Sequence, residues 1–186
     1  MGTGGMLPTL TVGELELRPA LPADAEAVFA FEQRALAVPE ARRFLLRAPP
    51  ASVDEVRARI ERSSASFSVD HSVFQWLIRL SDRDSVVGFV AFVRWNHEHH
   101  RSEVAWVIEP AHWGKGFAAL ATAQIVQLAW TELGLHRAEA HIDPENAASI
   151  RTAQKLGFAH EGTLRENVFT GTGYADTSLF AKVRPA

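Results

Sequence analysis

Two glycines and a lysine stand directly before a long predicted helix, in the segment 112–118. The first four amides of a helix have no partner within it, and the helix dipole adds about half a positive charge at that end. Gly114 and Gly116 carry no Cβ, so an anion can approach these amides closely, and Lys115 adds a full charge. We interpret the segment as a pyrophosphate-binding loop. The alternative is that its glycines only form a turn.

Other kinds of site are excluded or disfavoured. The loop has neither the spacing of a Walker A motif nor the GxGxxG pattern of dinucleotide-binding folds. The absence of cysteine excludes disulfides, thiolate zinc sites and cysteine nucleophiles. The segment 97–100 contains three histidines, but no companion ligands are suitably spaced nearby, and a solvated hairpin turn explains it. We therefore expect no metal site.

The elements that must hold the loop are predicted from the spacing of apolar residues. In the first part of the chain we expect one strand over 10–17 and helices over 22–34, over 42–46 and after a capping box of Ser52 and Glu55. Strand-like runs at 73–80, 86–95 and 103–108, separated by the polar turns 81–85 and 96–101, predict antiparallel hairpins. A helix over 117–133, a strand over 138–142, a helix over 146–156 and two strands complete a mixed α/β pattern.

Length and charge narrow the class of protein. A chain of 186 residues fits one domain, which we place at 10–186 after a loosely ordered segment 1–9. With 19 basic and 22 acidic residues the net charge is −3, which argues against a nucleic-acid-binding surface. The first residues lack the regions of a signal peptide, and no apolar run approaches the roughly 20 residues that span a bilayer. We expect a cytoplasmic protein without a membrane partner.

Several spaced motifs resemble the GNAT acetyltransferases and, within them, the RimJ/RimL type of ribosomal-protein N-terminal acetyltransferase. In chain order these motifs are 102–108, 113–118, 135–140, 146–150, 155–158, 161–162 and 164–166. The resemblance covers about residues 10–183 and is densest from 99 to 179. It implies an α/β fold whose mixed, mostly antiparallel sheet splays into a V with helices on both faces. It also implies an enzyme that uses acetyl-CoA as cosubstrate.

The resemblance assigns the parts of a CoA site to positions of this chain. In the family the pyrophosphate sits on loop amides that match Trp113, Gly114, Lys115, Gly116, Phe117 and Ala118. The pantetheine arm runs beside a splayed strand that matches Trp106, Val107 and Ile108. Asn146 matches a position that contacts this arm, and Ser149 matches one that faces the sulfur.

Acetylation of an amine needs that amine in its neutral form. At pH 7, deprotonation takes about 4.6 kcal/mol for a lysine amine and only about 1.4 kcal/mol for an α-amine, from their ordinary pKa values. An enzyme acting on protein N-termini therefore needs only a mild base. Glu103 matches a strand glutamate of the RimJ/RimL pattern and is our predicted base, with Glu161 and Glu166 as further candidates. The alternative is that Glu103 is a strand carboxylate paired with an arginine.

Two other groups are needed for the transfer. Ser149 either protonates or hydrogen-bonds the departing thiolate, or it only satisfies backbone groups at the start of its helix. Amides in a bulged strand near Val107 are expected to stabilise the oxyanion. The chain departs from the classical family at Ala153, where a tyrosine acid is usual, and at Val168, where some members have glutamate. Its only tyrosine, Tyr174, is expected in a turn.

Three functions follow as hypotheses. The first is direct acetyl transfer to a protein N-terminal α-amine, ribosomal or other, and the absence of cysteine excludes an acetyl-cysteine intermediate. The second is acetylation of a small amine such as a drug, a polyamine or an amino acid. The third is a CoA-binding sensor without turnover. A homodimer is compatible with each of them.

Overall fold

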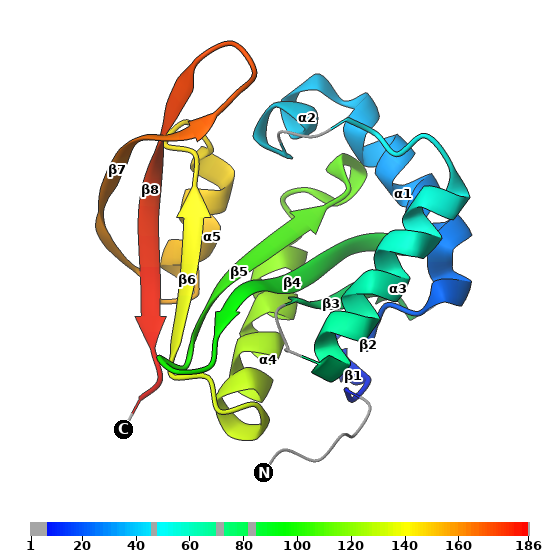
Figure 1. The fold of residues 1–186 in the computed structure, drawn as a ribbon, viewed down its shortest axis with the longest axis horizontal. Helices are drawn as coiled ribbons and strands as arrows, with labels where there is room; N and C mark the ends of the chain where they lie inside the picture. The colour runs from blue at the N-terminus through cyan, green and yellow to red at the C-terminus, as the bar shows by residue number, and fades with distance from the viewer. Residues whose placement is uncertain (1–6, 46–47, 70–72, 82–84, 186) are drawn as a thin grey trace.

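An eight-stranded mixed sheet is the framework of the computed structural model, which describes residues 7–45, 48–69, 73–81 and 85–185 (Figure 1). The strands are β1 (Leu10–Val12), β2 (Leu15–Pro19), β3 (Val73–Leu80), β4 (Val86–Asn96), β5 (Arg101–Ile108), β6 (Arg137–Ile142), β7 (Ala159–Phe169) and β8 (Tyr174–Val183). The helices are α1 (Ala25–Ala37), α2 (Pro39–Leu45), α3 (Val53–Val69), α4 (Phe117–Glu132) and α5 (Ala147–Lys155), with short 3-10 turns at Pro22–Asp24 and Pro110–His112.

The sheet has the order β1-β2-β3-β4-β5-β6-β8-β7, and every neighbouring pair is antiparallel except β5 and β6. These two central strands pair only from Arg101 to Glu103, opposite Arg137 to Glu139, and then diverge. The divergence confirms the predicted V: β1–β5 form one arm and β6–β8 the other (Figure 1). Parallel strands need a long crossover connection, which α4 supplies here.

Helices cover both faces of the larger arm, as predicted. On one face, α1 and α3 bury Phe31, Val56 and Ile60 against Leu77 and Val86. On the other, α4 contributes Phe117, Ala121, Ile125 and Ala129 to the main core, which also contains Trp76, Phe92 and Val104 of the sheet. Each layer excludes water from one face of the same sheet, and burying apolar area in this way is the main favourable term in folding.

The predicted single strand over 10–17 was wrong. The chain forms two strands, β1 and β2, which pair as a hairpin with Leu10 opposite Leu17. Gly13 lies in the turn with φ 58°, a left-handed conformation that glycine adopts at little cost. The loose alternation across this segment came from two short strands, and it gave no signal for the turn between them.

Other predictions needed smaller corrections. Pro39 ends α1 but also begins α2, so the second helix covers Pro39–Leu45 and not 42–46. One of the two hydrogen bonds of the capping box forms as predicted, because Ser52 Oγ accepts from the Glu55 amide at 3.2 Å. The other differs, because the Glu55 carboxylate accepts from the Ala51 amide at 2.8 Å and not from the Ser52 amide. Residue 46, the turn residues 82–84 and residues 1–6 of the expected loosely ordered segment lie outside the described residues.

The strand irregularity expected near Val107 lies elsewhere. Val107 of β5 pairs regularly with Phe89 of β4. The register shifts instead between Val93 and Asn96, where Arg94 has φ 53°. The chain near Val107 is distinctive for another reason, which is that β6 has already diverged from it. No helix in the described part of the chain is long and apolar enough to cross a membrane.

Candidate functional site

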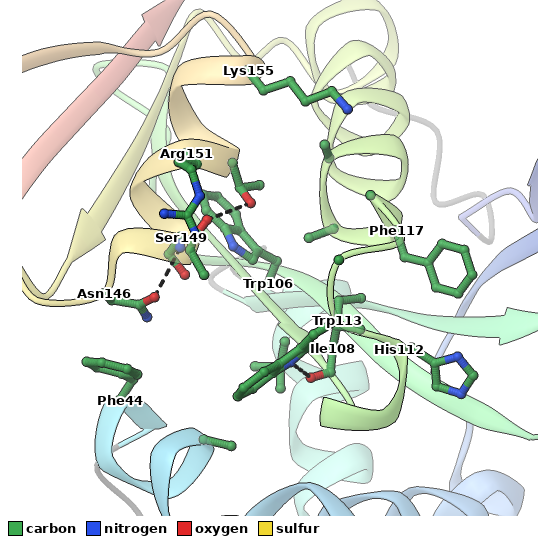
Figure 2. Close-up of a pocket in the computed structure, with 18 of the residues that line it drawn as sticks. Phe44, Trp106, Ile108, His112, Trp113, Phe117, Asn146, Ser149, Arg151 and Lys155 are labelled. Carbon is green, nitrogen blue, oxygen red and sulfur yellow. Dashed lines mark hydrogen bonds between the residues drawn. The ribbon is translucent and has the colours of Figure 1, made fainter.

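A cavity of about 520 Å³ lies where β5, the following loop, α4, α5 and α2 come together (Figure 2). Most residues that sequence analysis placed at a CoA site line it: Trp106, Val107, Ile108, Trp113, Gly114, Gly116, Phe117, Ala118, Asn146 and Ser149. They come from two stretches of the chain, 106–118 and 146–149, which the crossover from β5 through α4 to β6 and α5 brings together.

The loop before α4 has the backbone conformation that the glycine pattern implied. Gly114 has φ 79° and Gly116, the N-cap of α4, has φ 80°. Both are left-handed conformations in which a side chain would be strained. The loop is also tied to the end of β5, because Trp113 Nε1 donates a hydrogen bond to the Ile108 carbonyl at 2.8 Å. The first amides of α4 are thus held at the wall of the cavity.

An ion pair that sequence analysis missed anchors the end of β5. Glu109, which is only 9% exposed, accepts hydrogen bonds from Arg34 Nε at 2.7 Å and from Arg34 Nη2 at 3.1 Å. Arg34 also donates to the Val86 carbonyl at 3.2 Å. The hydrogen bonds to Glu109 raise the pKa of the Arg34 guanidinium, so this cation stays charged. The pair joins α1 to the residue from which the loop departs.

The structure places two lysines near the loop, the predicted Lys115 and a second one, Lys155. Lys115 is exposed and lies outside the cavity lining; its Nζ is 3.2 Å from His112 Nδ1 and 5.7 Å from the centre of the Phe117 ring. Lys155, at the end of α5, extends towards the first turn of α4 (Figure 2). Its Nζ lies 3.9 Å from the point at which a Cβ on residue 116 would sit. Lys155 therefore brings a cation from α5 to the start of α4, and a role of Lys115 in binding stays a prediction.

Helix α5 carries several groups into the cavity. Asn146 caps it, with Oδ1 accepting from the Ser149 amide at 3.0 Å, and Asn146 and Ser149 both line the cavity. The Ser149 hydroxyl makes no hydrogen bond to another residue in the described part of the chain, unlike that of Thr152, which donates to the Ala148 carbonyl at 3.0 Å. Arg151 and Lys155 follow at a spacing of four residues, so both face the cavity.

Glu103 lies where β5 and β6 begin to diverge, at the last paired position of the two strands. Its side chain is 16% exposed, and Oε2 accepts from Arg94 Nη1 at 2.9 Å. Glu103 does not line the cavity. The ion pair is the arrangement expected under the alternative interpretation, and the role of Glu103 as a base stays a prediction.

The further candidate bases are placed differently. Glu161 is bound by both terminal nitrogens of Arg137, at 2.9 and 2.5 Å, and these hydrogen bonds lower the pKa of the Glu161 carboxyl. A carboxyl with a lowered pKa is a weaker base. Glu166 is exposed on β7 and has φ 50°, and Tyr174 is 68% exposed at the start of β8. None of the three lines the cavity.

Helix α2 forms one wall of the cavity. Glu40, Ala41, Phe44 and Leu45 of α2 line it, opposite the residues of α5 (Figure 2). The helix also contacts the loop before α5, through an ion pair between Arg43 and Glu145. In the described residues no group of three or more histidine or acidic side chains is arranged to hold a metal ion, and the segment 97–100 forms the β4–β5 turn.

Comparison with known proteins gives a consistent picture. The family model described as "Acetyltransferase (GNAT) domain" matches residues 14–159. The uncharacterized N-acetyltransferase YoaA of Bacillus subtilis is 31% identical over 97% of this chain and 99% of its own length. Spermidine N(1)-acetyltransferase of Escherichia coli is 36% identical over 47% of each chain. The solved structure of RimL, a ribosomal L7/L12 alpha-N-protein acetyltransferase in complex with coenzyme A, superposes with a TM-score of 0.83 at 16% identity, covering 95% of this chain and 98% of that one.

Proposed function

The chain belongs to the GNAT acetyltransferase family, which uses acetyl-CoA, and on this premise we propose that it transfers the acetyl group to the N-terminal α-amine of a protein. The observation that carries the proposal is that three features line one cavity. They are the loop amides at the start of α4, the part of β5 that has no neighbouring strand on the β6 side, and the polar first turn of α5. This arrangement suits a long, partly anionic donor and leaves the α2 wall for an acceptor.

The residues present fit acetyl-CoA. Gly114, Gly116 and the first amides of α4 would hold the pyrophosphate, with the cations of Arg151 and Lys155 beside it. Trp106, Val107 and Ile108 would lie along the pantetheine arm, and Asn146 would contact it. When bound, acetyl-CoA supplies the acetyl group as a reactive thioester.

Two residues are proposed to move protons. Ser149, whose hydroxyl is not engaged by the described residues and lines the cavity, would donate a proton to the departing sulfur. Glu103 would accept the proton of the amine. It lies four residues before Val107 on β5, about 13 Å along an extended strand, so we propose that the proton reaches it through a chain of several water molecules. The amine nitrogen gains the acetyl group as the carbon–sulfur bond breaks.

The fold likeness to RimL supports a protein N-terminus as acceptor. A small polyamine is the second candidate, and the observation that favours it is the 36% identity with a spermidine acetyltransferase over 87 residues. The two candidates share one chemistry, a primary amine.

The test is an acetyl-CoA assay with peptides that have free or blocked N-termini, run beside spermidine. Turnover on the free peptides alone supports the proposal, and turnover confined to spermidine contradicts it.

A second experiment tests the base. Glu103→Gln should lower kcat, and the plot of kcat against pH should lose the limb that reports ionisation of the base. Glu98→Gln, in the exposed β4–β5 turn, is the control. An unchanged pH profile for Glu103→Gln would exclude Glu103 as the base.

A further inference from the structure

Among the described residues that line the cavity, three carry charged side chains that no described residue neutralises. Arg151 and Lys155 stand on α5, and Glu40 stands on α2; within the described part of the chain none of them has an ion pair or a side-chain hydrogen bond. Figure 2 shows Arg151 and Lys155 on one side of the space and α2, with Phe44, on the other. The cavity therefore has a positive side and a negative side.

Glu40 is the only carboxylate among the described residues that line the cavity. Its own helix carries two cations, Arg42 and Arg43, and Arg43 is engaged by Glu145 in the loop before α5. The Glu40 side chain is exposed to solvent at the rim of the α2 wall. Around it Ala41, Phe44 and Leu45 form an apolar surface. A carboxylate beside such a surface suits a cationic group carried on an alkyl chain.

The negative charge of Glu40 favours different positions in the cavity for the acetyl donor and for the acceptor. Glu40 repels phosphates, so the anionic part of the donor is drawn to Arg151 and Lys155. In the proposed reaction Glu103 accepts the proton of the reacting amine, whereas a carboxylate that stays ionised beside an amine stabilises the protonated form of that amine. The charge left for Glu40 to attract is therefore another positive charge on the same acceptor.

We propose that Glu40 is a specificity-determining residue that binds a second positive charge on the acceptor, apart from the amine that is acetylated. The inference rests on the proposed amine acetylation and names the substrate class more closely. Two sources have this chemistry: a protein N-terminus followed by a basic residue, and a linear diamine or polyamine. In either case the Glu40 carboxylate would attract the second positive charge of the acceptor.

The experiment compares pairs of acceptors that differ only in the second charge. One pair is a peptide with lysine or glutamine at its second position, and the other is a linear diamine and the monoamine of equal length. The kcat/KM ratio of charged to neutral acceptor is measured for the wild-type protein, Glu40→Gln and Glu26→Gln. Glu26 is an exposed first-turn carboxylate of α1, as Glu40 is of α2, and it lies outside the cavity, so it controls for the loss of a favourable helix-end charge.

We expect the wild-type protein and Glu26→Gln to favour the charged acceptor. In Glu40→Gln the kcat/KM ratio of charged to neutral acceptor should fall about five- to tenfold, mainly because KM for the charged acceptor rises. The preference should also weaken with added salt. If the preference appears with the peptides, the acceptor is a protein N-terminus, and if it appears with the diamine and monoamine, the acceptor is a polyamine. An equal ratio in the wild-type protein and Glu40→Gln would overturn the inference while leaving acetyl transfer intact. Failure of the wild-type protein to acetylate any amine would overturn both, and calorimetry with CoA would show whether donor binding fails as well.

Discussion

The Nζ of Lys155, at the end of α5, lies 3.9 Å from the point where a Cβ on Gly116 would sit at the start of α4. A cation from one helix thus stands beside the unpaired amides at the start of another. The partial positive charge of the helix dipole and the full charge of the lysine lie at the same place, which favours the binding of a phosphate there. Lys115, the nearest lysine in sequence to these amides, lies instead against His112 and Phe117.

Lys155→Gln should therefore weaken CoA binding about fivefold, because one unit charge near a partly exposed phosphate contributes about 1 kcal/mol. Lys115→Gln is the matched control, since it removes the same charge from outside the cavity and should change the affinity less than twofold. Calorimetric titration with CoA at two salt concentrations measures both. A larger effect at Lys115 would reverse the assignment.

Gly116→Ala should destabilise the fold by about 1–2 kcal/mol, because alanine is strained at φ 80°. It should also weaken CoA binding, since the new Cβ stands at the amides. Gly134→Ala is the control: Gly134 has φ 72°, its surroundings are open and it lies outside the cavity. Thermal unfolding should show similar losses in both variants, whereas only Gly116→Ala should lose affinity. Equal affinities would show that the amides are not used.

Gly88→Ala should destabilise the protein by about 1–3 kcal/mol, the usual range for overpacking a core. A Cβ at Gly88 of β4 would overlap the Val107 carbonyl and approach Ile108 Cδ1 to 2.8 Å, so β5 must shift at residues that line the cavity. Gly173→Ala, with open space and no left-handed backbone, is the control. Chemical denaturation measures the difference. A fully stable Gly88→Ala would contradict the close approach of these strands.

Arg34→Met should destabilise the fold by about 1–2 kcal/mol, because it leaves the buried Glu109 carboxylate without its partner. The effect is below that of a fully buried pair since half of the Arg34 side chain is exposed. Arg57→Met breaks the exposed pair with Asp54 and should change stability by less than about 0.5 kcal/mol. If both variants unfold alike, Glu109 does not depend on Arg34.

Asp24 should make the protein sensitive to acid. Burial opposes its ionisation, but hydrogen bonds from Arg18 and the Leu21 amide outweigh burial and lower the pKa of the Asp24 carboxyl. A group with a lowered pKa in the folded state stabilises the protein above its unfolded pKa of about 3.9, and this stability is lost as the pH falls further. Asp24→Asn should therefore be less stable at pH 7 and lose less stability between pH 5 and 3. Parallel acid-unfolding curves would contradict this.

Much of the fold follows from local signals. The helices 117–132 and 147–155 begin and end at glycine or asparagine positions that the sequence shows, and the hairpin of β4 and β5 follows from two apolar runs around a polar turn. The β1–β2 hairpin was missed because its strands are short and its turn contains a single glycine. Alternation alone cannot show where a strand reverses.

The sequence by itself determined the glycine loop, the Asn146 cap and the strand that ends at Ile108, because backbone conformation at a glycine or a helix start depends on neighbours along the chain. Only the tertiary structure decided which lysine stands beside the loop, that Arg34 holds Glu109, and that α2 brings Glu40 to the far wall. These relationships join segments separated by 39 to more than 100 residues. They depend on how the layers pack, and no local pattern encodes that packing.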